Sequence, residues 1–169
     1  MSDTQVPSWT NVLEQRPTFV TNLECGLSGE EVASDRLHGL SSVGRPFLVR
    51  YNLPALAKSL DKETLAARPP DMWRYREFLP VRETANIVSL GECMTPLMPA
   101  PGVSGDLWIK DEGRLPTGSF KARGLCLAVS MAKELGVTRM AMPTNGNAGA
   151  ALAAYCRSAG IEAFVFCPD

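Results

Sequence analysis

The chain has little histidine, little net charge and no cluster of basic residues. Its 169 residues include one histidine, His38, and the formal net charge at pH 7 is −1. A Ser-His-Asp triad would have to use His38 or a histidine of a partner chain, so we do not expect that chemistry. We expect His38 to lie on the surface. The lack of a lysine- and arginine-rich stripe argues against a nucleic-acid partner.

Long apolar runs are also missing. No run approaches the roughly 18 residues that a membrane-spanning helix needs. Residues 1–18 lack the basic start and the apolar stretch of a signal peptide. We therefore expect a cytoplasmic protein with no membrane partner.

The cysteines are not arranged as in a disulfide framework or a zinc site. The five cysteines are widely spaced, and none forms a Cys-x-x-Cys pair. Neither a disulfide framework nor a zinc site follows from this pattern. Cys126 and Cys156 lie within apolar helical patterns, where we expect them to be buried as small hydrophobic side chains.

The chain changes in texture near residue 107. The earlier part is irregular and rich in proline, with short helices expected at 62–68 and 71–79. Beyond it, the pattern predicts strands at 107–110, 138–142 and 161–167 and helices at 119–135 and 147–159. This alternation predicts an α/β fold in which helices cover a parallel sheet.

The carboxyl ends of parallel strands share one edge of a sheet, and ligands bind there in open α/β folds. The loops 111–118 and 143–147 each follow an expected strand and precede an expected helix. We therefore expect them to open on the same side. The helix at 147–159 is built of small apolar residues, and the chain ends soon after the next strand. We expect an incomplete fold, the N-terminal part of a longer one. The alternative is a three-stranded unit that a partner chain completes.

Lys121 stands where a helix should begin. A breaker-rich turn, Leu115 to Gly118, precedes it, and Ser119 is a natural N-cap. A cation in the first turn faces the positive end of the helix dipole, which favours the neutral amine. Schiff-base chemistry requires such an amine. Taken alone, the pattern also fits a solvated lysine beside a helix start.

The loop Pro143 to Gly149 joins a strand to a helix. Gly146 allows a positive φ, and successive N–H groups at a helix start form a site for a carboxylate or a phosphate. Asparagine and glycine are also ordinary turn residues, so this loop alone indicates only a turn.

Together the two loops resemble those of the fold-type II pyridoxal-phosphate enzymes, and among these the threonine synthases most closely. The segments that carry the resemblance are Pro116–Gly124, Thr144–Gly149, Val88–Leu97, Leu107–Gly113 and Met72–Tyr75. The resemblance implies a tryptophan synthase β-like fold and pyridoxal 5'-phosphate as cofactor. It also implies conversion of O-phosphohomoserine and water to threonine and phosphate.

The resemblance also implies a role for each matching residue. Lys121 would bind the cofactor covalently and transfer protons at the carbons of the amino-acid substrate. Phe120 would position the cofactor ring, and Asn147 would donate to its phenolic oxygen. The remaining residues of the loop would hold the substrate carboxylate: Thr144, Asn145, Gly146 and Ala148.

Several positions depart from the family pattern. Ala122 stands where aspartate is frequent, and Asn145 and Ala148 replace more usual hydroxyl residues, so the substrate stays open. Residues 23–44 resemble a small zinc ribbon that has lost three of its four cysteines; its equivalent positions are Cys25, Ser28, Ser41 and Val43. One thiolate cannot hold a tetrahedral zinc, so we expect no metal there.

Four parts of the chain follow from this reading. They are a flexible N-terminus (1–20), a degenerate ribbon-like segment (21–60), a helical and irregular lead-in (61–106) and the α/β part (107–169). The family's phosphate loop and its partner for the pyridine nitrogen would lie beyond residue 169. We therefore expect the chain alone to bind the cofactor weakly or not at all, without turnover.

Two alternatives remain open. One is another fold-type II enzyme, such as one like threonine dehydratase. The other is a non-catalytic paralogue that pairs with a complete subunit, and a homo-oligomer is open as well. We interpret Trp73, Tyr75 and Phe78 as packing residues. Three charged residues follow the expected strand at 107–110 or end it: Lys110, Asp111 and Glu112. We interpret them as a solvated strand end, although they could approach a phosphate or orient the lysine loop.

Overall fold

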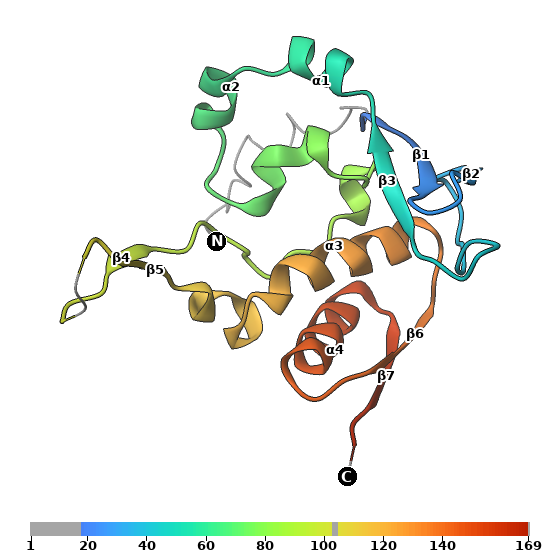
Figure 1. The fold of residues 1–169 in the computed structure, drawn as a ribbon. Coiled ribbons are helices and arrows are strands. Elements are labelled where there is room, and N and C mark those ends of the chain that lie inside the picture. Colours follow the sequence, from blue (N-terminus) through green and yellow to red (C-terminus); the bar gives the residue numbers. More distant parts are fainter. Residues whose placement is uncertain (1–17, 103–104, 169) are drawn as a thin grey trace, which may run out of the picture. The chain divides into compact units, whose positions relative to one another are not determined.

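The structure is a computed structural model that describes residues 18–102 and 105–168. These residues form two compact units. The first holds the described residues up to Ala66 together with Tyr75–Ile87, and the second holds Ala67–Arg74 and the described residues from Val88 onward. Our four-part division of the chain stays a prediction. Figure 1 gives the labels used below.

The first unit is built around a small antiparallel sheet. Its strands, in the order β2-β1-β3, are β1 (Val20–Cys25), β2 (Glu31–Val32) and β3 (Phe47–Tyr51). Two short helices follow, α1 (Leu53–Ser59) and α2 (Lys62–Ala67). The Asn52 side chain caps α1 by accepting from Ala55 N. α2 is the helix that the sequence predicted at 62–68.

The segment expected to be a helix at 71–79 is a 3₁₀ helix, Met72–Phe78, with a kink at Tyr75. The packing interpretation fits Trp73, which is buried. Tyr75 and Phe78 are 42% and 41% exposed, so much of each ring remains in contact with solvent.

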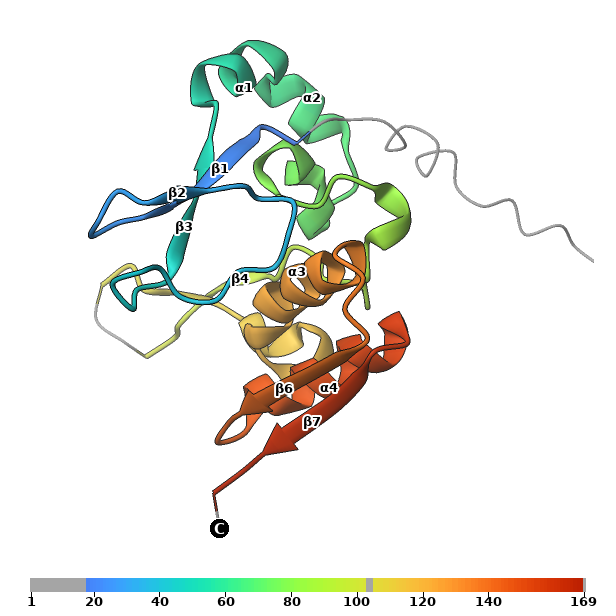
Figure 2. The ribbon, with the colours of Figure 1, turned by 90° about the vertical axis from the view of Figure 1, so that its right-hand side faces the viewer.

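The second unit contains the regular α/β part. It comprises α3 (Lys121–Glu134), β6 (Arg139–Pro143), α4 (Asn147–Ala159) and β7 (Glu162–Phe166). β6 and β7 pair in parallel, from Arg139 opposite Glu162 to Pro143 opposite Phe166. Figure 2 shows the two strands side by side with α4 against them. These helices and strands lie where the sequence predicted them.

One expected member of the parallel sheet is elsewhere. We expected 107–110 to pair with the later strands, and this prediction was wrong. β5 (Trp108–Lys110) instead pairs antiparallel with β4 (Leu97–Pro99), forming a two-stranded ladder that extends away from α3 and α4 (Figure 1). Antiparallel strands need only a short connection, whereas parallel strands need a crossover. The nearby apolar segment at 97–99 therefore offers β5 a closer partner.

The core of this unit lies between α3 and α4. Small and medium side chains allow the helices to pack closely, and the residues that are fully buried there include Cys126, Val129, Leu152, Tyr155 and Cys156. The burial of both cysteines confirms the expectation for them. α4 ends at Gly160, whose left-handed backbone (φ 71°) needs no Cβ.

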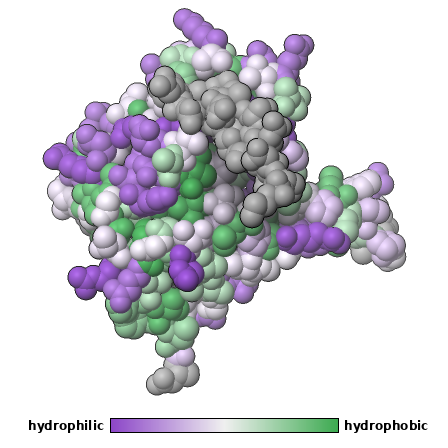
Figure 3. Space-filling view, turned by 180° about the vertical axis from the view of Figure 1, so that it is seen from behind, coloured by the Kyte–Doolittle hydropathy of each residue, from purple (hydrophilic) through white to green (hydrophobic). Residues whose placement is uncertain are grey.

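The sheet has one face against α4 and one apolar outer face. The ideal Cβ of Gly149 would lie 2.7 Å from Val165 Cγ1, so Val165 points toward α4. Phe164 and Phe166 then lie on the other face, because side chains alternate along a strand. They are 43% and 62% exposed. Hydrophobic surface is visible in the lower part of Figure 3.

Two kinds of feature are absent from the described residues. None of their helices has the length and apolar character that crossing a bilayer requires. The same residues contain no group of three or more His, Cys, Asp or Glu side chains that could hold a metal ion.

Candidate active site

Lys121 is the first residue of α3 and so lies in the first turn, as the sequence predicted, although the N-cap residue is Phe120 and not Ser119. Ser119 has an extended backbone (φ −157°, ψ 160°), and its hydroxyl accepts from Lys121 N at 3.3 Å. The turn before it contains Thr117, which has a φ of 64° and is the one non-glycine residue with positive φ among those described. Such a conformation is uncommon for a β-branched residue. The chain is therefore held in a strained turn immediately before the lysine.

The second loop is organised by Thr144. Its N–H donates to Phe166 O at 2.9 Å, which ties the loop to the end of β7. Its hydroxyl oxygen accepts from Gly146 N and from Gly149 N, each at 3.2 Å. The hydroxyl therefore caps the first turn of α4. Its contact with a substrate carboxylate stays a prediction.

The two loops line one pocket. A shallow, open pocket of about 510 Å³ is lined by Lys121 and by residues 143–148. The structure thus brings together nearly all the site residues that we predicted. Phe120 does not line this pocket. It is 58% exposed, and Lys121 Nζ lies 4.5 Å from the centroid of its ring.

The pocket contains donors for an anion. Among the described residues, no protein acceptor meets the N–H groups of Asn147 and Ala148 in the first turn of α4. These groups lie at the positive end of the helix dipole. Asn145 and Asn147 are exposed, so their amides are accessible from solvent. An amine and two backbone N–H donors at a helix start therefore border the same space.

A neighbouring polar network was missed by our sequence interpretation. Glu112 accepts two hydrogen bonds from the Arg123 guanidinium, at 2.7 Å and 3.0 Å, and one from the Thr95 hydroxyl. The bonds from Arg123 and Thr95 lower the pKa of Glu112 to about 2. Glu112 is therefore no solvated strand end. Opposite charges on either side of the lysine turn were the signal available in the sequence.

A second network holds a buried carboxylate. Glu92 has no exposed surface. It accepts hydrogen bonds from the Tyr155 hydroxyl, from Ser89 Oγ at 2.7 Å and from Leu90 N at 2.9 Å. Burial raises the pKa of Glu92, but these bonds outweigh burial and the net pKa is lowered. Burial and the bond to Glu92 raise the pKa of Tyr155. Glu92 therefore joins segment 88–95 to α4.

The site lies within a segment that matches a known family. Residues 88–169 match the family described as "Pyridoxal-phosphate dependent enzyme". This segment belongs to that family. The match covers every residue of the pocket, and pyridoxal phosphate is the cofactor of these enzymes.

Several relatives of this pyridoxal-phosphate-enzyme segment are named threonine synthase. The one from Synechocystis sp. is 45% identical over 101 residues, which cover 56% of this chain and 26% of the relative. Those from Methanocaldococcus jannaschii and Methanosarcina acetivorans are 38% and 34% identical, over 70% and 87% of this chain. The matches extend over 26% to 37% of the length of these relatives.

The residues of the pocket fit the family's cofactor. An aldehyde needs an amine, which Lys121 supplies at the edge of an open space. An anionic group needs donors, and the first turn of α4 supplies two N–H groups. The individual roles that we expected for Phe120, Asn145 and Asn147 stay predictions.

Proposed function

We propose that this chain carries the lysine-bearing part of a pyridoxal-phosphate-dependent active site of the threonine synthase type. Its substrate would be an amino acid with a phosphorylated γ-hydroxyl, and its products threonine and phosphate. One observation carries the proposal: Lys121 lines the same pocket as the loop at 143–148. The threonine synthase relatives support the choice of reaction.

When bound, the cofactor would withdraw electrons from the substrate carbons, which is chemistry that no side chain of the pocket can supply. The protein's own contribution is orientation. The Lys121 amine would bind the cofactor aldehyde and later accept and return protons at the substrate carbons. The N–H groups of Asn147 and Ala148 would hold the substrate carboxylate, and the Asn147 amide would donate to the cofactor's phenolic oxygen.

Thr144 has a supporting role in this scheme. Its hydroxyl already accepts two backbone N–H groups, so it fixes the loop that presents the donors. Asn145, Gly146 and Ala148 line the pocket around the expected carboxylate. A substrate anchored there would present its carbons to the lysine, and such fixed placement is a large part of catalysis. The oligomeric state and the pairing with a complete subunit stay predictions.

The proposal is tested by the selectivity of cofactor capture. Because we expect the full chain to bind pyridoxal phosphate only weakly, the cofactor is added in excess and the lysine-bound fraction is trapped by reduction. Borohydride reduction and peptide mapping should place the adduct on Lys121, while the other lysines serve as internal controls: Lys58, Lys62, Lys110 and Lys133. Labelling that spreads over all lysines according to their exposure, with no preference for Lys121, would refute the proposal.

A further inference from the structure

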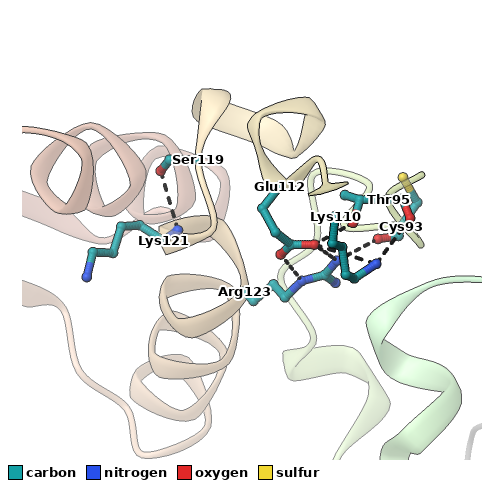
Figure 4. A network of polar contacts seen from close by, with 7 residues as sticks. All are labelled: Cys93, Thr95, Lys110, Glu112, Ser119, Lys121 and Arg123. Carbon is teal, nitrogen blue, oxygen red and sulfur yellow. Dashed lines mark hydrogen bonds and ion pairs between the residues drawn. The ribbon is translucent and has the colours of Figure 1, made fainter. Parts of the chain in front are cut away.

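We propose that Glu112 is a positioning residue that fixes, through Arg123, the direction in which Lys121 leaves helix α3. The inference rests on the proposed function of Lys121. It assigns a role to a carboxylate that does not line the pocket. Figure 4 shows Glu112, Arg123 and Lys121 together with their neighbours.

The first support is the number of contacts that converge on Glu112. Arg123 Nε donates to Oε2 at 2.7 Å and Nη2 donates to Oε1 at 3.0 Å, a two-pronged pairing that fixes orientation as well as distance. The same Nη2 donates to Cys93 O at 3.0 Å. The Thr95 hydroxyl donates to Glu112, and Lys110 Nζ donates to Thr95 O at 3.1 Å.

These contacts join three separate segments at one point. Residues 93–95 end the segment 88–95, Glu112 follows β5, and Arg123 lies in the first turn of α3. Glu112 and Arg123 are only 26% and 30% exposed at their side chains. Partial burial weakens screening by water and salt, so the pair holds its geometry better than a surface pair.

The second support is the geometry of the helix start. Lys121 and Arg123 are two residues apart, which is about 200° around a helix of 3.6 residues per turn. Their side chains accordingly leave α3 on opposite sides (Figure 4). Fixing the Arg123 side chain therefore sets the rotation of the first turn and with it the direction of the Lys121 amine.

The first turn needs such a constraint. It is held by short-range bonds, Ala122 N to Ser119 O and Arg123 N to Phe120 O, both at 3.2 Å. Helix ends fray more readily than helix centres. The turn also has no acidic residue, although it carries Lys121 and Arg123 at the positive end of the dipole. Glu112 supplies the missing negative charge from outside the helix.

The variant Glu112→Gln tests the proposal in the full chain. It keeps the shape of the side chain and removes its charge. We expect the rate of pyridoxal phosphate capture at Lys121, relative to Lys58 and Lys62, to fall about 10- to 100-fold, as for small misplacements of reacting groups. Arg123→Lys should cause a similar loss, because lysine keeps the charge but cannot make the two-pronged contact. The charge-swapped double variant Glu112→Arg/Arg123→Glu should recover part of the rate.

The matched control is Glu24→Gln in the first unit. Glu24 Oε2 also lies 2.7 Å from the Nε of its partner Arg50, and the side chains of Glu24 and Arg50 are 30% and 42% exposed. We expect no change in capture at Lys121 from this variant. A structural role alone would lower the rate of capture at Lys121 in proportion to the drop in the unfolding midpoint, whereas a positioning role lowers it at an unchanged midpoint.

The outcomes separate the two proposals. If the unmodified chain shows no preference for Lys121, the proposed function fails. If pyridoxal phosphate labels Lys121 selectively in the unmodified chain and to the same extent in Glu112→Gln, only the positioning role is overturned. Should Glu112→Gln not fold, Thr95→Val decides, because it removes a single hydrogen bond to Glu112. An intermediate loss of selectivity supports the role, and an unchanged rate overturns it.

Discussion

Replacing Glu92 with alanine is expected to destabilise strongly the unit that carries the site. The change leaves the buried Tyr155 hydroxyl and the partly buried Leu90 N without their acceptor. Each buried polar group left unsatisfied costs about 1–3 kcal/mol, so a total loss of about 3 kcal/mol or more is expected. That is a large part of the stability of an ordinary domain. The loss of stability is measured by hydrogen exchange of the α4 amides at increasing urea concentration.

The matched control is Glu24→Ala, since Glu24 is only partly buried and lies in the first unit. Its effect on the urea midpoint should be small, because an ion pair that is open to solvent contributes little to stability. Tyr155→Phe should fall between the two variants, because it removes one donor and keeps the carboxylate. Equal α4 protection in Glu92→Ala and in the unmodified chain would contradict the structural role of Glu92.

The same carboxylates make stability depend on pH in a definite direction. The pKa of Glu92 is lowered in the folded protein, and that of Glu112 is lowered to about 2. Both therefore stabilise the fold fully above the pKa of an ordinary glutamate. This contribution declines as the pH falls through the folded-state pKa values, because the unfolded chain then binds more protons.

Gly149→Ala is expected to be the second large change. The new Cβ would lie 2.5 Å from Thr144 Cγ2 and 2.7 Å from Val165 Cγ1. Both neighbours are β-branched and stiff, and the Thr144 rotamer is also held by its two hydrogen bonds. Relief of the clash must displace the loop at 144–148, at a cost of about 1–3 kcal/mol. Urea unfolding and cofactor capture at Lys121 should both weaken.

Gly124→Ala is the matched control for that change. Gly124 lies in α3, and its ideal Cβ meets no heavy atom within 4 Å. Alanine should therefore stabilise this helix by about 0.5–1 kcal/mol. If both alanine variants had the same effect on the urea midpoint, the close approach at Gly149 would not constrain the loop.

The sequence predicted those parts of the fold that depend on local signals. The helices α3 and α4 and the strands β6 and β7 follow from apolar patterns bounded by glycine and turn residues. Lys121 and the loop at 143–147 were placed on one side because parallel strands share an edge. The two do line a common pocket, but β5 is not part of the parallel sheet, so the expected outcome is observed although its premise was wrong for the first loop.

The sequence could not show which distant segments pair. β5 reads as a strand by itself, but its partner depends on competition between β4 and the later strands. Glu112 and Glu92 each look like ordinary surface carboxylates, because burial comes from Arg123 and Tyr155, 11 and 63 positions away. Charge and spacing hint at the Glu112–Arg123 pair but give no sign that Glu92 is buried.

The central claim is that Lys121 and the start of α4 border one binding site. An amide proton–nitrogen correlation spectrum of the chain, recorded before and after pyridoxal phosphate is fixed to Lys121 by reduction, tests it most directly. The largest shifts should occur at Asn147 and Ala148, with little change in β1–β3. Unchanged amides at 145–148 in a chain labelled at Lys121 would contradict the claim.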